Sequence, residues 1–568
     1  MRFGNWETGS YNRDAAVDLC NNGVNPLVSV LLVSRGVTGI EKACAFLGDE
    51  PGVIYDPFLL ADMGKAVSRI NAALQGNERI AVYGDYDVDG ITSSALLALW
   101  LRSKNADFEI YIPERIGEGY GLNTTALDTL KANGVSLVIT VDCGITAHGE
   151  ALYARELGLS LVITDHHECR GDLPEAEAVI DPKRPDCVYP NKALAGVGVA
   201  FKLVCALEND EDPRELLERY GDLVAVGTVA DVMPLKGENR ELIRRGLLVL
   251  SESRRPGIVR LLQEVFPQPG RVTATTVGFI LAPRLNAAGR MRQTELALNL
   301  LLTESDAEAE MLTMELCRLN SERRSHEQEV FEQATDMLHD LSPDGPIILA
   351  KRGWYQGVTG IVASKMAERY RVPAIIISIG EDGTGRGSCR SFGGFPLYQA
   401  MLTCADILKD YGGHELAVGV TIDEDNIEEL KRRLTDYYRE SDCVGNVPAL
   451  KLDFEVIKPD LLTVENLEAL AELEPFGNGN PPPNLCIMGA EVSMAVPIGE
   501  GKHSRLKLEK WGRSLDCIFF SMPPKDLGVR EGMAIDVAFE PQINDYRGRK
   551  NVQLNLLDIR ESNFGRRV

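Results

Sequence analysis

Three apolar runs in the first third of the chain share one pattern: each resembles a buried β-strand and ends abruptly in acidic or imidazole side chains. They occupy residues 80–90 (IAVYGDYDVDG), 135–144 (VSLVITVDCG) and 159–167 (LSLVITDHH). Because the carboxyl ends of parallel strands converge on one crevice of an open sheet, we expect these three ends to meet. Carboxylates with one or two imidazoles suit a divalent metal ion, and such a site favours phosphate chemistry.

The rest of the pattern predicts several further parts. Up to about residue 290, short runs rich in Val and Ile alternate with helical stretches, which predicts βα units and a mostly parallel sheet. Residues 304–341 contain no Pro or Gly and predict a long, exposed helix between two α/β segments. A glycine-rich α/β segment follows, and from about residue 449 short strands separated by turns predict a small β-barrel or sandwich.

Composition and charge change this picture only in part. A chain of 568 residues is too long for one hydrophobic core, so we expect three or more domains. The net charge of −24 argues at first sight against a nucleic-acid partner. However, metal ions would neutralise part of the acid, and residues 491–568 carry 13 Lys and Arg against 11 Asp and Glu. A local groove that binds a polyanion is therefore still open.

The cysteine usage indicates the compartment. The twelve cysteines are scattered without a Cys-x-x-Cys pair, which suits a reducing environment rather than a disulfide framework. No apolar run is long enough to span a bilayer, and the first residues lack the pattern of a signal peptide. We therefore expect a cytoplasmic protein with no membrane association.

The first strand end carries alternating carboxylates, Asp85, Asp87 and Asp89. In an extended segment residues two apart point the same way, so these like charges crowd together, which is costly unless a cation lies between them. A calcium EF-hand loop also begins D-x-D-x-D-G. That loop needs a Glu at its twelfth position, where this chain has Leu96, and a preceding helix rather than a strand. The remaining alternative, a polar turn with unconnected acids, is disfavoured by the other two strand ends.

Asp142, Asp165, His166, His167 and Asp231 complete the candidate set. Alone, Asp142 would more often cap a helix than bind a metal, and adjacent histidines could form a plain surface turn. Asp142 and the two histidines become candidates for the metal site because they lie at strand ends like the other acids. An Asp beside a ligand His often orients the imidazole. Asp231 is a single charge inside an apolar run, so it should be buried, and buried charges are paired or bind metal.

These segments resemble the motifs of the DHH phosphoesterase superfamily and, within it, of the RecJ family of single-strand-specific 5'→3' DNA exonucleases. The four motif segments are residues 85–90, 141–144, 165–167 and 230–234. Further RecJ-like segments are residues 113–122, 194–202 and 283–290. The resemblance covers nearly the whole chain.

The resemblance implies an α/β fold with a mostly parallel-sheet DHH domain, a long connecting helix, a smaller α/β DHHA1 domain and a C-terminal OB-like β-barrel. The expected parts are an N-terminal segment (1–45), the DHH catalytic domain (46–300), the helical connector (301–342), the DHHA1 domain (343–445) and an OB-like nucleic-acid-binding domain (446–568). The implied activity is release of 5'-mononucleotides from single-stranded DNA by two-metal hydrolysis, in DNA repair and recombination.

By the same resemblance, two Mn²⁺ or Mg²⁺ ions lie at the strand ends. One ion is assigned to Asp85 and Asp87. The other is assigned to Asp89, His166 and Asp231, and Asp142 bridges the two. Asp165 and His167 are predicted to be catalytic: Asp165 is expected to orient His166, while His167 faces the scissile phosphate.

The chain also contains candidates for holding DNA. The resemblance implies that residues 388–391 and 412–414 are phosphate-binding motifs of the DHHA1 domain. Candidates to hold the 5'-terminal phosphate and backbone are Arg115, Arg290, Ser388, Arg390, Ser391 and His414, and the arginines among them can bind phosphate bidentately. In the tail, six basic residues are predicted to bind single-stranded DNA; they are Lys502, Arg505, Lys507, Arg547, Arg549 and Lys550. Phe519, Phe520 and Tyr546 nearby could stack on bases or could instead belong to the core, and the sequence does not separate these two roles.

Several points stay open at this stage. Tyr355 stands where RecJ proteins often have His, which puts in doubt a polar contact between domains. The Gly-Val-Gly of residues 196–198 lacks the full nucleotide-loop fingerprint and more simply allows close helix packing. Alternative functions are a DHH phosphodiesterase on short oligonucleotides or cyclic dinucleotides, and an inactive DNA-binding protein. Besides single-stranded DNA, the expected partners are a single-strand-binding protein and a helicase, and the chain is expected to be a monomer.

Overall fold

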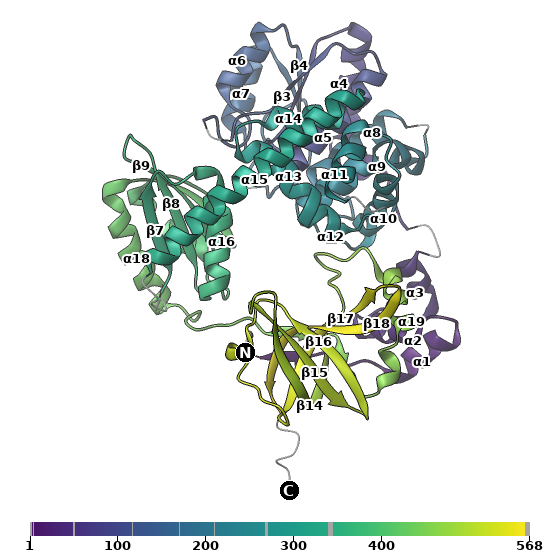
Figure 1. Ribbon diagram of the computed structural model, residues 1–568. Coiled ribbons are helices and arrows are strands. Elements are labelled where there is room, and N and C mark those ends of the chain that lie inside the picture. Colours follow the sequence, from purple (N-terminus) through teal and green to yellow (C-terminus); the bar gives the residue numbers. More distant parts are fainter. Residues whose placement is uncertain are drawn as a thin grey trace. The chain divides into compact units, whose positions relative to one another are not determined.

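The computed structural model describes residues 3, 5–48, 52–115, 117–169, 171–209, 211–266, 271–338 and 345–562. The chain forms two compact units (Figure 1). The larger unit holds Val53–Gly445 and Gly477–Gly479. The smaller unit holds Met1–Gly52, Asn446–Phe476 and Asn480–Val568.

The larger unit contains a five-stranded, fully parallel sheet in the order β3-β2-β4-β5-β6. Its strands are β2 (Ile80–Tyr83), β3 (Phe108–Tyr111), β4 (Leu137–Val141), β5 (Ser160–Thr164) and β6 (Ala178–Ile180). From β2 the chain passes to β3 at one edge and then returns to β4 on the other side of β2. The predicted parallel sheet is thereby confirmed, and its strand order reverses between β2 and β4, where open α/β sheets bind ligands.

Alternating side chains divide this sheet into two apolar faces. Ala81 and Tyr83 point to one face, which α6 (Thr124–Ala132) and α7 (His148–Glu156) cover. Ile80 and Val82 point to the other face and join a large core. The helices of that core are α4 (Met63–Gly76), α5 (Val88–Ser103), α8 (Gly196–Leu207), α9 (Pro213–Ala230), α10 (Gly237–Ser251), α11 (Pro256–Val265), α13 (Ala282–Arg290) and α14 (Thr294–Leu302). Helix α5 is apolar on nearly all sides because this core surrounds it.

The predicted connector is a single helix, α15 (Asp306–Met337), of 32 residues. Ser305 caps its first turn by accepting a hydrogen bond from the Glu308 backbone N–H at 3.3 Å. One side of the helix is buried, including Leu316 and Val330, while the other side is charged and solvent-exposed. The helix thus packs first on the parallel-sheet domain and then on α16 (Thr359–Tyr370) of the next domain.

That next domain has a mixed sheet in the order β10-β11-β9-β8-β7. Its strands are β7 (Ile347–Arg352), β8 (Ala374–Ile379), β9 (Thr384–Arg390), β10 (Leu408–His414) and β11 (Ala417–Asp423). Only β7 and β8 are parallel. Helix α16 and the end of α15 cover one face at β7 and β8, and α17 (Leu397–Leu402) and α18 (Ile427–Glu440) cover the other.

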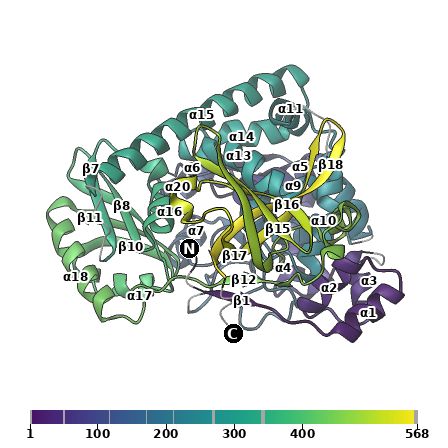
Figure 2. The ribbon, with the colours of Figure 1, turned by 60° about the horizontal axis from the view of Figure 1, so that its bottom comes forward.

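The smaller unit is built on a closed barrel of five strands. They are β14 (Leu485–Ile498), β15 (His503–Lys510), β16 (Arg513–Phe519), β17 (Ala534–Tyr546) and β18 (Arg549–Glu561). The neighbours run β14-β15-β16-β18-β17, and β17 pairs back onto β14. Figure 2 shows β15, β16, β17 and β18 of this barrel. This is the strand order of an OB fold, so the predicted barrel is confirmed.

The N-terminal residues belong to this same unit. Strand β1 (Trp6–Thr8) pairs in parallel with β12 (Leu450–Leu452). Helices α1 (Arg13–Asn21), α2 (Pro26–Ser34) and α3 (Ile40–Leu47) contribute to the apolar core that contains the inner barrel residues. The indole of Trp6 donates to Asp558 Oδ2 at 3.0 Å, which ties the first strand to the last one. The segment 1–45 is therefore part of the barrel unit rather than a part of its own.

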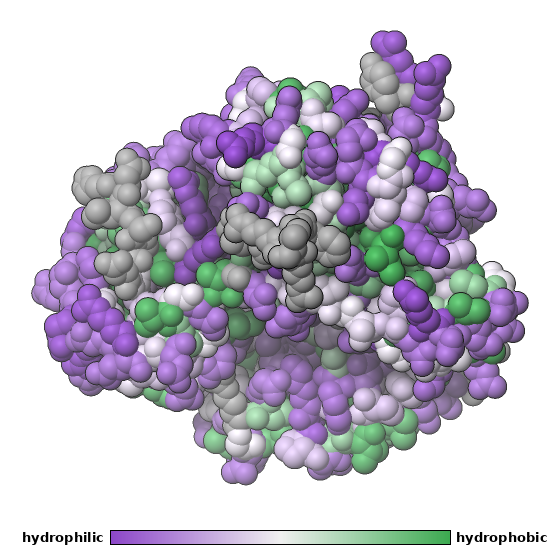
Figure 3. Space-filling view, turned by 90° about the horizontal axis from the view of Figure 1, so that it is seen from below, coloured by the Kyte–Doolittle hydropathy of each residue, from purple (hydrophilic) through white to green (hydrophobic). Residues whose placement is uncertain are grey.

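The surface shows no broad apolar area on the face turned to the viewer in Figure 3, where hydrophilic side chains predominate and apolar ones are scattered. Among the described residues, no helix is both long enough and apolar enough to cross a membrane.

Candidate active site

Six candidate metal ligands lie at element ends around the point where the strand order of the parallel sheet reverses. Asp85 and Asp87 follow β2, and Asp89 lies in the first turn of α5. Asp142 follows β4, His166 lies two residues after β5, and Asp231 ends α9. We call these six residues the metal cluster.

The ligand atoms of the metal cluster fall into overlapping groups, in each of which all atoms lie within 4.8 Å of one another. One group contains Asp85, Asp87 and Asp142, and another contains Asp89, His166 and Asp231. Asp142 also forms a group with both histidines. The structure therefore places Asp142 next to both groups, with its Oδ1 3.1 Å from His166 Nε2.

Gly196, at the start of α8, allows these carboxylates to come so close. A Cβ at this position would lie 2.6 Å from the Asp142 Cβ, which is shorter than any tolerated contact. The backbone N–H groups of Gly196 and Val197 donate to Asp89 at 2.7 and 2.8 Å. The Gly-Val-Gly sequence therefore serves close packing, and the N-terminus of α8 holds Asp89 in place.

Burial and mutual repulsion give the cluster unusual proton affinities. Burial, together with neighbouring carboxylates, raises the pKa of Asp85, Asp89 and Asp142 well above the ordinary value. The same causes raise the pKa of Asp231 to about 7. Burial and the charge of His167 lower the pKa of His166 to about 3, so its imidazole is neutral.

Apart from the Asp89 carboxylate, several buried atoms of the metal cluster lack ordinary hydrogen-bond partners. Within the described part of the chain, Asp85 Oδ1, Asp142 Oδ1, His166 Nε2 and Asp231 Oδ2 accept no hydrogen bond and donate none. Buried acceptors without donors are rare in proteins because each one costs its full desolvation penalty. Oxygen atoms and one neutral imidazole, gathered in this way, fit divalent cations of the Mn²⁺ or Mg²⁺ type.

His167 is held differently from His166. Asp165 Oδ1 accepts hydrogen bonds from the ring Nδ1 of His167 at 2.7 Å and from the backbone N–H of His166 at 2.7 Å. Burial disfavours charge on His167, but the hydrogen bond and charge of Asp165 outweigh it and raise the pKa of His167 to about 9. The hydroxyl of Tyr120 lies 3.1 Å from the same Nδ1 and donates to the Asp142 carbonyl at 3.2 Å. His167 is therefore a charged imidazole with a fixed orientation.

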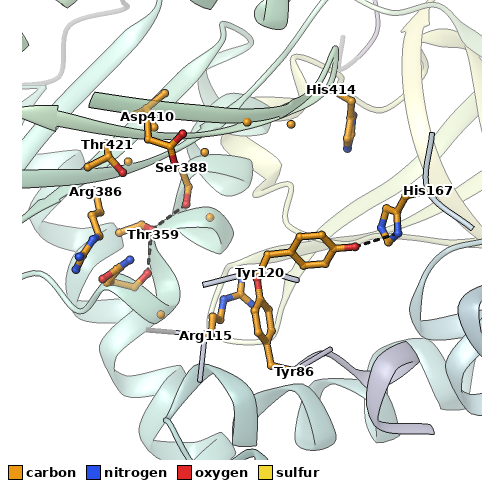
Figure 4. A pocket seen from close by; sticks show the side chains of 18 of the residues that line it. Tyr86, Arg115, Tyr120, His167, Thr359, Arg386, Ser388, Asp410, His414 and Thr421 are labelled. Carbon is orange, nitrogen blue, oxygen red and sulfur yellow. Dashed lines mark hydrogen bonds between the residues drawn. The ribbon is translucent and has the colours of Figure 1, made fainter. Parts of the chain in front are cut away.

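A cavity of about 650 Å³ extends from His167 and Asp165 to the sheet of the second α/β domain. Figure 4 shows His167 and Tyr120 at one side of it and Arg386, Asp410 and Thr421 at the other. Ser388 and Thr359 lie between these two sides, and their hydroxyl oxygens are 3.0 Å apart.

The middle of the cavity is strongly cationic. Burial lowers the pKa of the Arg290 guanidinium to about 9, and the nearby charges of Arg115, Arg323 and Arg390 contribute to the shift. At the start of α16, a Cβ added to Gly360 would lie 3.0 Å from Arg390 Nη2 and 3.4 Å from Ser388 Oγ. We call Arg115, Arg290 and Arg390 the arginine cluster. Guanidinium groups gathered beside a helix N-terminus form a favourable site for a phosphate group.

Three family models match in order: the DHH family N-terminal domain over residues 79–228, the DHHA1 domain over residues 344–440 and the RecJ OB domain over residues 453–558. A Bacillus subtilis protein named single-stranded-DNA-specific exonuclease RecJ is 40% identical over an alignment that covers 98% of this chain and 71% of that protein. The chain belongs to the RecJ family. An Escherichia coli protein of the same name is 35% identical, with 94% of this chain and 96% of that protein covered.

Solved structures of the RecJ family agree with this assignment. The crystal structure of RecJ in complex with Mn²⁺ from Thermus thermophilus matches with a TM-score of 0.84 and 30% identity, over 98% of this chain and 79% of that one. The Mg²⁺ complex from the same organism matches with a TM-score of 0.79 and 29% identity, over 98% of this chain and 78% of that one.

Around the cavity, the structure differs from the expectations for Asp165 and Ser391. Asp165 was expected to orient the His166 ring, but its carboxylate accepts from the His167 ring instead. Ser391 was expected to hold phosphate, but its hydroxyl donates to the Phe395 carbonyl at 2.6 Å and does not line the cavity. The reason is local: after β9 ends at Arg390, the chain turns and Ser391 closes that turn.

The other candidates for phosphate lie as follows. Arg115, Arg290, Ser388 and His414 line the cavity, and Arg390 lies behind Gly360 at its edge. The lining residues that sequence reasoning missed include Tyr86, Tyr120, Arg386, Asp410 and Thr421. Alternation along β9 was a usable signal for Arg386, because Arg386, Ser388 and Arg390 share one face of the strand.

Tyr355 stands where RecJ proteins often have His, and it still makes a polar contact between the two α/β domains. Its hydroxyl donates to the Arg290 carbonyl at 2.8 Å, and its ring stacks on His326 with centroids 4.9 Å apart. The side chain thereby links the second α/β domain to the residue at the centre of the arginine cluster.

The barrel candidates are only partly suited to binding. Phe519 is fully buried and belongs to the core, whereas Phe520 is half-exposed. The side chain of Tyr546 lies outside the described residues. Of the six basic residues, Lys502, Arg505 and Lys550 form ion pairs with Glu500, Asp516 and Glu468. Lys507 is half-buried, and Arg547 and Arg549 are exposed.

Proposed function

We propose that this protein is a metal-dependent exonuclease that degrades single-stranded DNA from the 5' end and releases 5'-mononucleotides. One observation carries the proposal: the cavity lined by Arg115 and Arg290 reaches His167, whose ring forms one group with Asp142 and His166 of the metal cluster. A nuclease that grips a terminal phosphate beside its cleavage site must cut near that end. The RecJ relatives named single-stranded-DNA-specific exonucleases support the same substrate.

The residues of the metal cluster fit two Mn²⁺ or Mg²⁺ ions, which solved RecJ structures contain. Asp85 and Asp87 would hold one ion, Asp89, His166 and Asp231 the other, and Asp142 both. When bound, such ions lower the pKa of a water molecule and stabilise negative charge on a phosphodiester. The buried acceptors without donors support this assignment.

The side chains around the cluster position the substrate. His167 is charged and lines the cavity, and its Nδ1–H donates to Asp165. The other N–H of its imidazolium, at Nε2, can therefore donate a hydrogen bond to the scissile phosphate. Asp165 also accepts from the Ile145 backbone N–H at 2.9 Å, which fixes the carboxylate. The arginine cluster binds the terminal phosphate and so sets the distance between the end of the strand and the bond that is cut.

The preference for single-stranded over double-stranded DNA, and for long over short strands, would come from the OB barrel. Its basic side chains Lys502, Arg505, Lys507, Arg547, Arg549 and Lys550 and the half-exposed Phe520 are the groups such barrels use to hold several nucleotides. A role in DNA repair and recombination, a cytoplasmic location, a monomeric state, and a single-strand-binding protein and a helicase as partners stay predictions.

Two alternatives fit less well. A phosphodiesterase for short oligonucleotides or cyclic dinucleotides has no use for an OB barrel, and the RecJ OB model matches residues 453–558. An inactive DNA-binding protein should have lost metal ligands, whereas all six residues of the metal cluster are present and close together.

The test uses one oligonucleotide labelled at the 5' or the 3' end, single-stranded or annealed to its complement, with Mn²⁺, Mg²⁺ or a chelator. We expect labelled mononucleotide at once from the 5'-labelled single strand and only late from the 3'-labelled one. We expect no reaction with the chelator and little with the blunt duplex. Internal fragments, release from the 3' end, or cleavage of dinucleotides alone would contradict the proposal.

A further inference from the structure

The sheet face that lines the cavity consists of three rows of residues, each running across β10, β11 and β9. The outer row contains Asp410, Thr421 and Arg386, which are cross-strand neighbours. The glycine row contains Gly412, Gly419 and Ser388. The inner row contains His414, Ala417 and Arg390. The two polar rows therefore stand on either side of a row that is nearly bare of side chains.

The glycine row forms an open floor. A Cβ added to Gly412 would meet no atom within 4 Å, and one added to Gly419 would meet only the Gly412 carbonyl, at 3.9 Å. Ser388, which is the single side chain of this row, lies beside Gly360 at the start of α16 together with Arg390. A phosphate held by the arginine cluster would therefore lie over or beside this floor.

The outer row has no such assigned role, although all its members line the cavity. Within the described residues, the side chains of Asp410, Thr421 and Arg386 make no ion pair and no side-chain hydrogen bond, even though they are direct neighbours across the strands. Their polar atoms are therefore available to a ligand. Figure 4 shows this row on the side of the pocket away from His167, with Ser388 and Thr359 between the two.

The spacing and chemistry of the outer row restrict what it can hold. Residues two apart along a strand are separated by about 7 Å, so the outer row lies roughly a sugar's length beyond the glycine row. Asp410 offers only acceptors, Arg386 only donors, and Thr421 both. A chain of further phosphates would be repelled by Asp410. A nucleoside, whose base edges and sugar hydroxyl combine donors and acceptors, suits the mixture.

We propose that the outer row, Asp410, Thr421 and Arg386, forms a second subsite that binds a nucleoside attached to the phosphate held by the arginine cluster. This rests on the proposed exonuclease function. On a strand with a 5'-phosphate, the terminal phosphate occupies the arginine cluster and the subsite stays empty. On a strand with a 5'-hydroxyl, the first internucleotide phosphate takes that place and the terminal nucleoside fills the subsite.

The consequence is a shift of the cleavage register by one nucleotide on 5'-hydroxyl strands. Water attacks the second internucleotide phosphorus, and its oxygen stays on that phosphorus as part of the new 5'-phosphate. The bond from this phosphorus to the 3'-oxygen of the second nucleotide breaks, and that oxygen takes a proton. The first product is a dinucleoside monophosphate, and the remaining strand, which now carries a 5'-phosphate, is degraded to mononucleotides.

The experiment compares 5'-phosphoryl and 5'-hydroxyl forms of one single-stranded oligodeoxynucleotide with the full chain and Mn²⁺. Reactions are stopped early and the first products identified by mass spectrometry. We expect mononucleotides from the first strand and a dinucleoside monophosphate as the first product of the second. A free nucleoside as the first product would overturn the subsite. The absence of products from both strands would instead overturn the proposed exonuclease function.

Variants test whether the outer row causes the shift. Arg386→Ala and Asp410→Asn should each lower kcat/KM on the 5'-hydroxyl strand, relative to the 5'-phosphoryl strand, roughly threefold to tenfold, because each loses hydrogen bonds to the terminal nucleoside. Asp410→Asn keeps the size and shape of the side chain, so a changed ratio in this variant reports lost charge and hydrogen bonding rather than a disturbed fold. The matched control is Lys409→Ala: this side chain pairs with Asp423 at 2.6 Å and does not line the cavity. An unchanged ratio in both outer-row variants, or an equal change in the control, would contradict the subsite.

Discussion

The end of the cavity at His167, beside the metal cluster, and the end at the arginine cluster suit groups of opposite charge, and the chain builds them in different ways. At the metal end, the carboxylates and the imidazole follow strands, begin a helix or end one, within a few residues of apolar segments. At the phosphate end, the side chains come from the face of an antiparallel sheet, where β9 and β11 bring residue 386 next to residue 421. Arg115 and Arg290 reach the same place from the other α/β domain.

The difference shows which kind of site a sequence reveals by itself. A site at the carboxyl ends of parallel strands needs only local signals, since each strand delivers its own ligand to a common edge. A site on a sheet face depends on the register between strands that are far apart in the sequence. The residues of the metal end can therefore be predicted correctly even when the predicted strand order is wrong, whereas those of the phosphate end cannot.

The strongest test of the metal end is Asp142→Asn. Because Asp142 belongs to the group of Asp85 and Asp87 and lies 3.1 Å from His166 of the other group, we expect nuclease activity to fall roughly 10³-fold or more. The metal-free variant should be at least as stable as the wild type, since one of several mutually repelling buried charges is gone. Activity on a labelled single strand and thermal unfolding without metal check both statements.

Metal binding gives the same variant a second readout. Mn²⁺ at about 100 times its Kd should stabilise the wild type by about 2.7 kcal/mol, and by much less in Asp142→Asn. Asp128→Asn is the matched control, because this exposed carboxylate only accepts a hydrogen bond from Tyr153. If Mn²⁺ stabilised Asp142→Asn as much as the wild type, the place of Asp142 in the metal cluster would be refuted.

The next largest effect is expected at the phosphate end, from Arg390→Ala. Losing a charged hydrogen-bond donor should lower kcat/KM on 5'-phosphoryl strands about 10- to 100-fold, and less on 5'-hydroxyl strands, where the bound phosphate carries less charge. Arg390→Lys keeps the charge but loses the planar fork, so it should recover only part of the activity. Equal losses on both strands, with unchanged Mn²⁺ binding, would argue that Arg390 serves the fold rather than the terminal phosphate.

Particular residues show where sequence reasoning succeeds. The alternation of Asp85, Asp87 and Asp89 and the strand-end positions of Asp142 and His166 are visible in short stretches, and the structure brings all of them together. The α/β class, the long helix and the barrel were also predictable, because each has its own period of apolar residues.

Other features depend on contacts that no short stretch reveals. Strand β1 pairs with β12, more than 400 residues later, and helices α1 to α3 complete the core of a barrel built from the other end of the chain. Asp165 accepts from the His167 ring and from the His166 backbone N–H, a choice between adjacent histidines that the sequence does not reveal. Phe519 lies two and four residues after Cys517 and Leu515 along β16, so these side chains share one face of the strand, but Ile518 on the opposite face blurs the alternation that would have marked Phe519 as buried.

A pair of serines offers a smaller and sharper comparison. Ser388 and Ser391 stand in one motif, but only Ser388 lines the cavity. Ser388→Ala should raise KM for 5'-phosphoryl strands roughly threefold to tenfold with little change in stability. Ser391→Ala should lower the free energy of unfolding by about 1 kcal/mol or less, because the Phe395 carbonyl loses one of its two donors and keeps the Leu397 backbone N–H, and it should leave KM unchanged. Steady-state kinetics and denaturant unfolding distinguish them, and the reverse pattern would mean that the roles are exchanged.

The smallest effect is expected from Tyr355→Phe, which tests how the phosphate end is held in place. The hydroxyl of Tyr355 donates to the Arg290 carbonyl, so its loss should cost about 1 kcal/mol of stability and loosen the position of Arg290. We expect KM for 5'-phosphoryl strands to rise a few-fold, while kcat and Mn²⁺ binding stay as in the wild type, because the metal cluster does not depend on this contact. Tyr355→His, which restores the side chain frequent in the RecJ family, should recover more of the KM than Tyr355→Phe. A fall in kcat or in Mn²⁺ binding would show that the two ends of the cavity are mechanically coupled rather than independently built.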